Sequence, residues 1–182
     1  MLRKQASVAK LKPTISLTAS SLKMKAGQST TAFKAAGLAK GDYVTKVTSG
    51  NTGIVKVSSV TKKGTFRLTA GKKAGSTTVK VILASKKSAS FKVTVQRGAV
   101  KTSKITVSTK SVTLKKGTTY RKLASSVKIT PVTSQEKVTY TSSNKKIATV
   151  TSGGVIKGLK KGTATITIRS GSKKTTCKVT VK

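Results

Sequence analysis

Pairs of adjacent lysines are the residues of this sequence with the clearest chemical potential. Seven pairs recur along the chain, at 62–63, 72–73, 86–87, 115–116, 145–146, 160–161 and 173–174. A lysine ammonium group is a compact point charge with three hydrogen-bond donors, so it attracts phosphates and carboxylates without the bidentate geometry of arginine. The pairs therefore indicate electrostatic attraction to anions.

The inventory of side chains argues against catalysis. The sequence has no histidine, and Asp42 and Glu136 are its only acidic residues. These two lie far apart in the sequence, so they do not suggest an acid–base pair, nor the carboxylate-rich loop of a calcium site. The single cysteine, Cys177, excludes an intrachain disulfide and, without histidine, a zinc site. We therefore expect no enzyme activity, no catalytic residues, no cofactor and no metal.

The charge balance is extreme, with 39 basic residues, two acidic residues and a formal net charge of +37. Such a chain repels itself, and an external polyanion would relieve that repulsion. Specific readout of nucleic acid is not expected, because it relies on arginine and on stacking aromatics. The sequence has five Arg against 34 Lys, and only three Tyr and three Phe.

An internal repeat in the sequence indicates which secondary-structure elements position these lysines. The segment "ISLTASSLKMKAG" (15–27) matches "ITVSTKSVTLKKG" (105–117), and "FKVTV" (91–95) matches "CKVTV" (177–181). The chain therefore holds two copies of a unit of roughly 85 residues. Apolar and polar residues alternate in short runs, which is typical of half-buried strands. Turn residues at intervals of about ten predict a β-sandwich of about seven strands in each copy.

These patterns divide the chain into four parts. We predict a basic N-terminal arm over 1–12, a first domain over 13–97, a linker over 98–103 and a second domain over 104–182. The N-terminus lacks the apolar core of a secretory signal, and no apolar run approaches the length of a membrane helix. If the sequence is a whole gene product, we expect it to be made and kept in the cytosol; if it is a fragment, its targeting information is lost.

The second copy resembles a known family. The segment "VTYTSSNKKIATVTSGGVIKGLKKGTATITI", followed by "TTCKVTV", is similar to bacterial immunoglobulin-like domains of group 2, and the similarity extends from Ile105 to Val181. The first copy departs from the pattern, with "VTSGNTGIVKV" in place of the Ser-Ser-Asn segment, so its assignment rests on the repeat. The resemblance implies an all-β chain of two tandem immunoglobulin-like β-sandwiches without catalysis. It also implies that Tyr140, in place of the family's usual Trp, packs in the core.

A sandwich gathers its turns at two ends, so the lysine pairs should crown the ends of each domain. We predict that binding involves the arm and these turns. The predicted polyanion-binding residues are Arg3, Lys4, Lys10, Lys12, Lys62, Lys63, Lys72, Lys73, Lys115, Lys116, Lys145, Lys146, Lys160, Lys161, Lys173 and Lys174. Cys177 aligns with Phe91 at an inward position and is expected to be a small buried hydrophobe.

Three functions remain open at this point. The first expectation is a phage virion accessory protein, for capsid decoration or an auxiliary role, made in the host cytoplasm and docked on an acidic capsid lattice. The alternative is a bacterial cell-surface adhesion or cell-wall-binding module on an anionic wall polymer, if the chain is a fragment of a secreted protein. The third is a non-specific nucleic-acid binder. None involves a small-molecule substrate.

Overall fold

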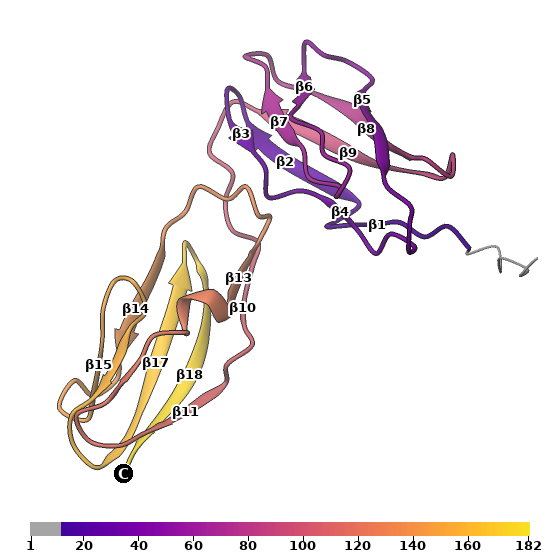
Figure 1. The fold of residues 1–182 in the computed structure, drawn as a ribbon. Helices are drawn as coiled ribbons and strands as arrows, with labels where there is room; N and C mark the ends of the chain where they lie inside the picture. Colours follow the sequence, from indigo (N-terminus) through magenta and orange to yellow (C-terminus); the bar gives the residue numbers. More distant parts are fainter. Residues whose placement is uncertain (1–11) are drawn as a thin grey trace, which may run out of the picture. The chain divides into compact units, whose positions relative to one another are not determined.

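The computed structural model describes residues 12–182. The chain divides into two compact units, with the division between Gly98 and Ala99 (Figure 1). Strands and turns make up almost the whole of both units, because alternating Val, Ile, Thr and Lys favour half-buried strands over helices.

The first unit contains two packed sheets and a short additional pairing. Its strands are β1 (Ser16–Leu17), β2 (Ser21–Lys25), β3 (Ser29–Thr30), β4 (Ala35–Ala36), β5 (Val44–Ser49), β6 (Val55–Ser58), β7 (Arg67–Ala70), β8 (Gly75–Leu83) and β9 (Ser88–Gln96). The larger sheet has the order β2-β9-β8-β5 and the smaller one the order β3-β7-β6. The β1–β4 pair completes the unit.

The second unit repeats this arrangement. Its elements are β10 (Lys104–Val107), β11 (Ser111–Leu114), β12 (Thr119–Tyr120), the 3-10 turn η1 (Ala124–Ser126), β13 (Val127–Thr130), β14 (Val138–Ser142), β15 (Ala148–Val150), β16 (Ile156–Gly158), β17 (Gly162–Ser170) and β18 (Lys173–Val181). The sheet orders are β11-β18-β17-β14 and β12-β16-β15, with β10–β13 as the additional pair. The same order in both units confirms the repeat.

One parallel pairing recurs in each large sheet. Strand β2 runs parallel to β9, and β11 runs parallel to β18, whereas their neighbours are antiparallel. The first strand of each large sheet thus lies beside the last strand of the same unit.

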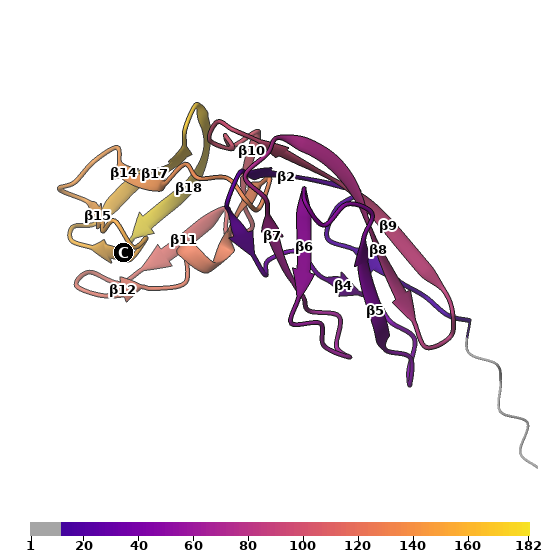
Figure 2. The same ribbon diagram turned by 90° about the horizontal axis from the view of Figure 1, so that it is seen from above.

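Inward side chains that alternate along the strands fill the core of each unit. Figure 2 shows the strands of the two units from above. In the first unit the inward residues of β8 and β9 meet Phe33 and Phe66, and the rings of Phe33 and Phe91 stack with centroids 4.0 Å apart. In the second unit the core consists mainly of aliphatic residues, and Cys177 is fully buried among them. The prediction for Cys177 is therefore confirmed.

The all-β architecture of two tandem sandwiches is confirmed as well. Over residues 12–182, each unit has nine strands instead of the expected seven, because short pairings such as β1–β4 and β10–β13 add to the two main sheets. Tyr140 packs against the second core from a partly buried position, as expected. None of the helical segments within residues 12–182 has the length and apolar character needed to cross a membrane.

The stretch predicted as a linker, 98–103, is held by hydrogen bonds at its C-terminal end. Thr102 is buried, and its hydroxyl lies 2.7 Å from that of Ser170 and 2.8 Å from that of Ser134. The Thr102 N–H donates to the Glu136 carboxylate at 2.7 Å. This polar network fixes the start of the second unit, so the part of 98–103 near Thr102 is not a free connector.

Candidate anion-binding sites

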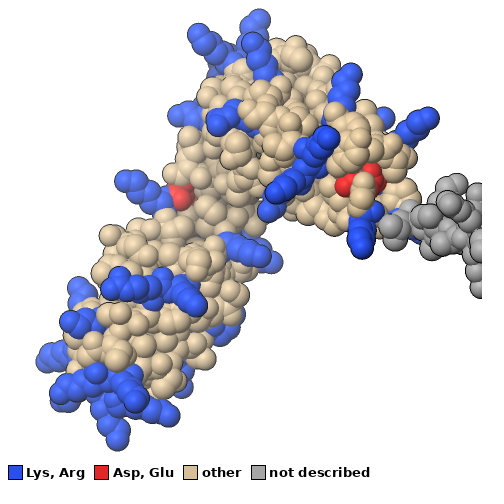
Figure 3. Space-filling model, viewed as in Figure 1, with Lys and Arg blue, Asp and Glu red and all other residues tan. Residues whose placement is uncertain are grey.

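Basic side chains are spread over the face of both units that Figure 3 shows. Every Lys and Arg from Lys12 onward is exposed. Of the predicted binding residues, Arg3, Lys4 and Lys10 lie outside the described residues. The others can be placed on the fold.

Six of the predicted lysines lie in turns at the end of the second unit where β17 begins and β18 ends. The C-terminus lies at the same end (Figure 1). We call this set the lysine crown; its members are Lys115, Lys116, Lys145, Lys146, Lys160 and Lys161. Backbone hydrogen bonds tie their turns together. The Lys116 N–H donates to the Lys182 carbonyl at 3.2 Å, and the Leu159 N–H donates to the Ile147 carbonyl at 2.8 Å. Three turns far apart in sequence therefore converge on one surface.

Local sequence explains why these turns form. Gly117 closes the turn after β11 with a positive φ of 82°, a conformation that suits glycine. Asn144 organises the next turn, since its Oδ1 accepts the Lys146 N–H at 3.0 Å. The Gly158 N–H donates to the Thr118 carbonyl, and the Gly117 N–H donates to the Gly158 carbonyl, so that β16 is joined to the first turn.

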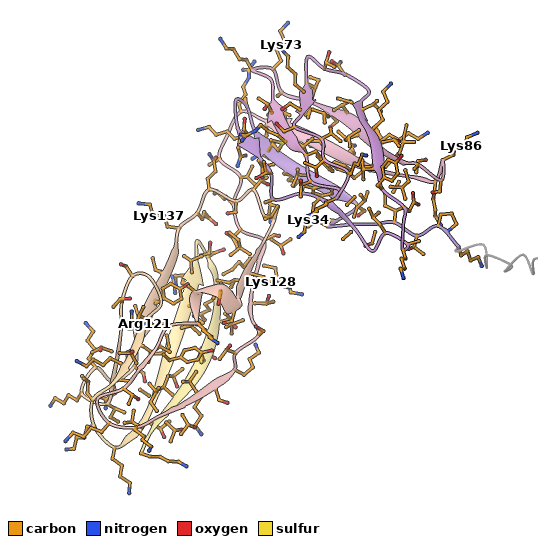
Figure 4. All side chains as sticks on the ribbon, in the orientation of Figure 1. Lys34, Lys73, Lys86, Arg121, Lys128 and Lys137 are labelled. Carbon is orange, nitrogen blue, oxygen red and sulfur yellow. The ribbon has the colours of Figure 1, made fainter. Side chains whose placement is uncertain are left out.

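The lysine pairs outside the crown lie at the opposite end of the second unit and at both ends of the first unit. Lys173 and Lys174 follow the β17–β18 turn, at the end opposite the crown. In the first unit the 62–63 pair lies near the β8–β9 hairpin, because the Val44 N–H donates to the Lys62 carbonyl and Val44 pairs with Leu83. Lys73, between β7 and β8, and Lys86, in the β8–β9 hairpin, lie at opposite ends of this unit (Figure 4).

The two acidic side chains are engaged by neutral donors. Asp42 accepts the Ser85 hydroxyl at 2.6 Å, and this hydrogen bond, helped by the backbone N–H groups of Ser85 and Tyr43, holds the pKa of the carboxyl below its usual value. Glu136 accepts the Thr102 N–H. Neither carboxylate belongs to the lysine crown, so the crown can receive negative charge from a partner.

A shallow hollow of about 340 Å³ lies beside the crown. It is lined by Tyr140, Thr141, Ser142, Lys145, Thr149 and Val150. Burial raises the pKa of the Tyr140 hydroxyl above its usual value. The lining offers four hydroxyls and one ammonium group, which are hydrogen-bond donors suited to a polar anionic chain. It contains no pair of residues that could act as acid and base. Within residues 12–182, no cluster of three His, Cys, Asp or Glu could hold a metal ion.

The thiol of Cys177 should be unreactive in the folded protein. Its side chain is 0% exposed, and burial raises the pKa of its thiol, with the positive charge of Lys110 acting in the opposite direction. Because the thiolate is the reactive species, we expect a thiol reagent to label it at pH 8 only as fast as the second unit unfolds. Labelling kinetics with and without urea would check this; rapid labelling without urea would contradict it.

Sequence reasoning missed the lysines that occur singly on strands. Lys23, Lys46, Lys80 and Lys92 are isolated in the sequence and resemble ordinary solvent-facing positions. Their relationship depends on strand order and register, which no single segment of the sequence reveals.

Comparison with known proteins identifies the second unit's family. The family model for the bacterial Ig-like domain (group 2) matches residues 101–180. No curated protein matches the chain.

Solved structures to which this chain is similar include S-layer and cadherin proteins. Domains 5–6 of the S-layer protein SbsC are 22% identical, with 94% of this chain and 97% of that chain covered and a TM-score of 0.46. The S-layer protein rSbsC(31-844) is 24% identical, with a TM-score of 0.39; 78% of this chain is covered but only 20% of that one. Drosophila N-cadherin EC1-3 is 9% identical, with 94% of this chain and 67% of that chain covered and a TM-score of 0.43.

Proposed function

Because residues 101–180 form a bacterial Ig-like domain of group 2, and the first unit repeats its sheet order, we propose that this chain is a non-enzymatic structural part of a bacterial cell-surface protein that binds an anionic wall polymer. The two sandwiches supply rigid, regularly built surfaces. The lysines on their ends supply the attraction.

The lysine crown is the observation that carries this proposal. Its six ammonium groups come from three turns that meet at one end of the second unit. Ordinary protein surfaces mix both signs of charge, which limits repulsion between neighbours. Six gathered lysines with no acidic residue among them are better explained by an anionic partner, which gains affinity by releasing its counterions.

The cell-surface assignment replaces the first expectation from the sequence. The family that matches is a bacterial domain family, and nothing in the comparisons supports a phage virion role. Non-specific nucleic-acid binding has no observation of its own, because any surface this basic attracts duplex DNA at low salt.

Replacing the six crown lysines with glutamine should weaken binding to a purified anionic wall polymer. The affinity for a polyanion decreases as salt rises, so the slope of log K against log salt is negative. If each crown lysine contacts one phosphate, the magnitude of this slope should decrease by about 4 in the variant, at roughly 0.7 per phosphate. Titration at several salt concentrations, followed by calorimetry or fluorescence, measures the slope.

The matched control removes the same charge from the same unit. It carries glutamine at Lys101, Lys104, Lys110, Lys122, Lys128 and Lys137, all exposed and none in the crown. We expect this variant to lose markedly less binding than the crown variant. Equal losses in the two variants would show that net charge alone matters, and the crown would then not be the site.

A further inference from the structure

The outer face of the large sheet in the first unit carries a second arrangement of lysines. Four exposed lysines lie on its four strands: Lys46 on β5, Lys80 on β8, Lys92 on β9 and Lys23 on β2, and β2 ends with a further exposed lysine, Lys25. The residues beside them in these strands, such as Val47, Val81 and Val93, point into the core. The four lysines therefore share one face.

The register aligns these lysines on a diagonal. Lys46 pairs with Ile82, two residues from Lys80. Lys80 pairs with Ser90, two residues from Lys92. Lys92 pairs with Ser21, two residues from Lys23. Each step crosses one strand and moves two residues in the same direction. Diagonal neighbours lie about 7–8 Å apart across an antiparallel pair, which applies to the first two steps. For the parallel step from β9 to β2, the strand spacing and the rise per residue give a similar distance of about 8 Å. We call this set the lysine diagonal.

The sandwich itself does not require lysines at these places. The equivalent positions in the second unit, found from the same pairings, are Thr139, Thr167, Lys178 and Thr113. Only one of them is basic. The protection of sheet edges by lysine does not explain the diagonal either, because β8 and β9 are the two central strands of their sheet.

We propose that the lysine diagonal binds an extended poly(polyol phosphate) chain, with one phosphate at each lysine. A backbone with three bonds per repeat extends by about 3.3–3.6 Å, so a phosphodiester backbone with six bonds per repeat, as in 1,3-linked glycerol phosphate, extends by roughly 7 Å. This repeat matches the step of the diagonal. The inference rests on the proposed function, for which it supplies a defined site and a defined polymer chemistry.

The surroundings of the diagonal favour a polyol over a nucleic acid. The flanking outward residues are mostly hydroxyl-bearing, including Thr48, Thr78, Ser90 and Thr94. Hydroxyls can exchange hydrogen bonds with a polyol backbone. Single-stranded nucleic acids instead gain affinity by stacking their bases on aromatic rings. Of this unit's aromatic residues, the three Phe are buried and Tyr43 precedes β5, beside Lys62, so none lies along the diagonal.

Two variants test separately whether binding depends on the charge of the four lysines or on their spacing. The first replaces Lys23, Lys46, Lys80 and Lys92 with glutamine. The second keeps the composition unchanged and moves two lysines along their own strands, by combining Lys46→Thr with Thr48→Lys and Lys80→Thr with Thr78→Lys. All six positions are on the solvent side of the sheet, and urea unfolding would verify that both variants are folded. The probes are a synthetic glycerol-phosphate oligomer with four phosphates and a thymidine oligonucleotide with four phosphates.

For the glycerol-phosphate oligomer, we expect the glutamine variant to reduce the magnitude of the slope of log K against log salt by about 3, because each of four phosphates contributes roughly 0.7. The register variant should reduce the magnitude of this slope by about 1. Its lysine at position 78 lies directly opposite Lys92 instead of diagonal to it, so the spacing is broken at that step and one phosphate lacks its lysine. The oligonucleotide should bind more weakly than the glycerol-phosphate oligomer. Unchanged affinity in the register variant would overturn the proposed match of spacing. Equal binding of both probes would overturn the choice of a polyol phosphate.

The crown variant distinguishes this inference from the proposed function. If only that variant loses affinity for wall polymer, the proposed function stands and the diagonal is not a site. If neither the crown nor the diagonal variant loses affinity, both proposals are wrong.

Discussion

Replacing Phe91 with alanine is expected to destabilise the first unit by about 3–5 kcal/mol, the range for removing a buried aromatic side chain. Phe91 is 2% exposed, and it stacks on Phe33 with ring centroids 4.0 Å apart. Phe66 completes the cluster, with its ring centroid 6.3 Å from that of Phe91. The two remaining rings, Phe33 and Phe66, lie next to the bridge between Lys34 and Thr65, which limits the movement of their backbone, so they can fill the cavity only in part.

The repeat provides a matched control for this substitution. Cys177 is the equivalent residue of the second unit and is fully buried as well. Cys177→Ala removes one sulfur atom, so we expect a loss of about 1 kcal/mol, close to that of one buried methylene. Urea unfolding of the full chain, followed by the NMR signals of residues in each unit, would report both values. A loss below about 1 kcal/mol for Phe91→Ala would mean that the three rings do not form the centre of the core.

Gly64→Ala should also be strongly destabilising, by about 2–3 kcal/mol, because steric crowding adds to an unfavourable backbone conformation. Gly64 has a φ of 87°, a region that costs other residues about 1–2 kcal/mol. A Cβ at this position would lie 2.6 Å from the Ala35 carbonyl oxygen. That backbone cannot easily retreat, because the Ala35 N–H donates to the Gly64 carbonyl at 2.9 Å. The substitution therefore strains the turn and weakens this hydrogen bond.

Gly98→Ala serves as the control for this effect. A Cβ at Gly98 would meet no atom within 4 Å, and its φ lies outside the positive range. We expect a change within about 0.5 kcal/mol, as for most surface substitutions. Thermal or urea unfolding of the two variants side by side would test the contrast. Similar stabilities would show that the turn at Gly64 relaxes without loss.

Much of the fold could be predicted from alternation alone. The runs "FKVTV" and "CKVTV" identified Phe91 and Cys177 as inward residues, and most of the lysine pairs lie in turns, as expected. Both predictions depend on local periodicity, which a single segment contains. The convergence of three turns on the crown follows once the strands are arranged as a sandwich.

The lysine diagonal could not be predicted in the same way. Strict alternation from the inward Val44 would turn Lys46 toward the core. The structure has a register shift between Val44 and Lys46, which reverses the phase so that Val47 points inward and Lys46 outward. A bulge of this kind depends on the partner strand, and so does the offset between β8 and β9. The sequence of one strand carries neither.

The parallel pairing of the first and last strands in each large sheet has a mechanical consequence. Ser21 at the start of β2 lies beside Lys92, and the chain leaves β9 at Gln96, beside the end of β2. A force that pulls the two ends of the first unit apart therefore acts along these strands and loads all their hydrogen bonds in shear, simultaneously. The β11–β18 pair places the second unit under the same geometry. In each unit, tension along the chain is therefore opposed by the hydrogen bonds of this parallel pair acting together.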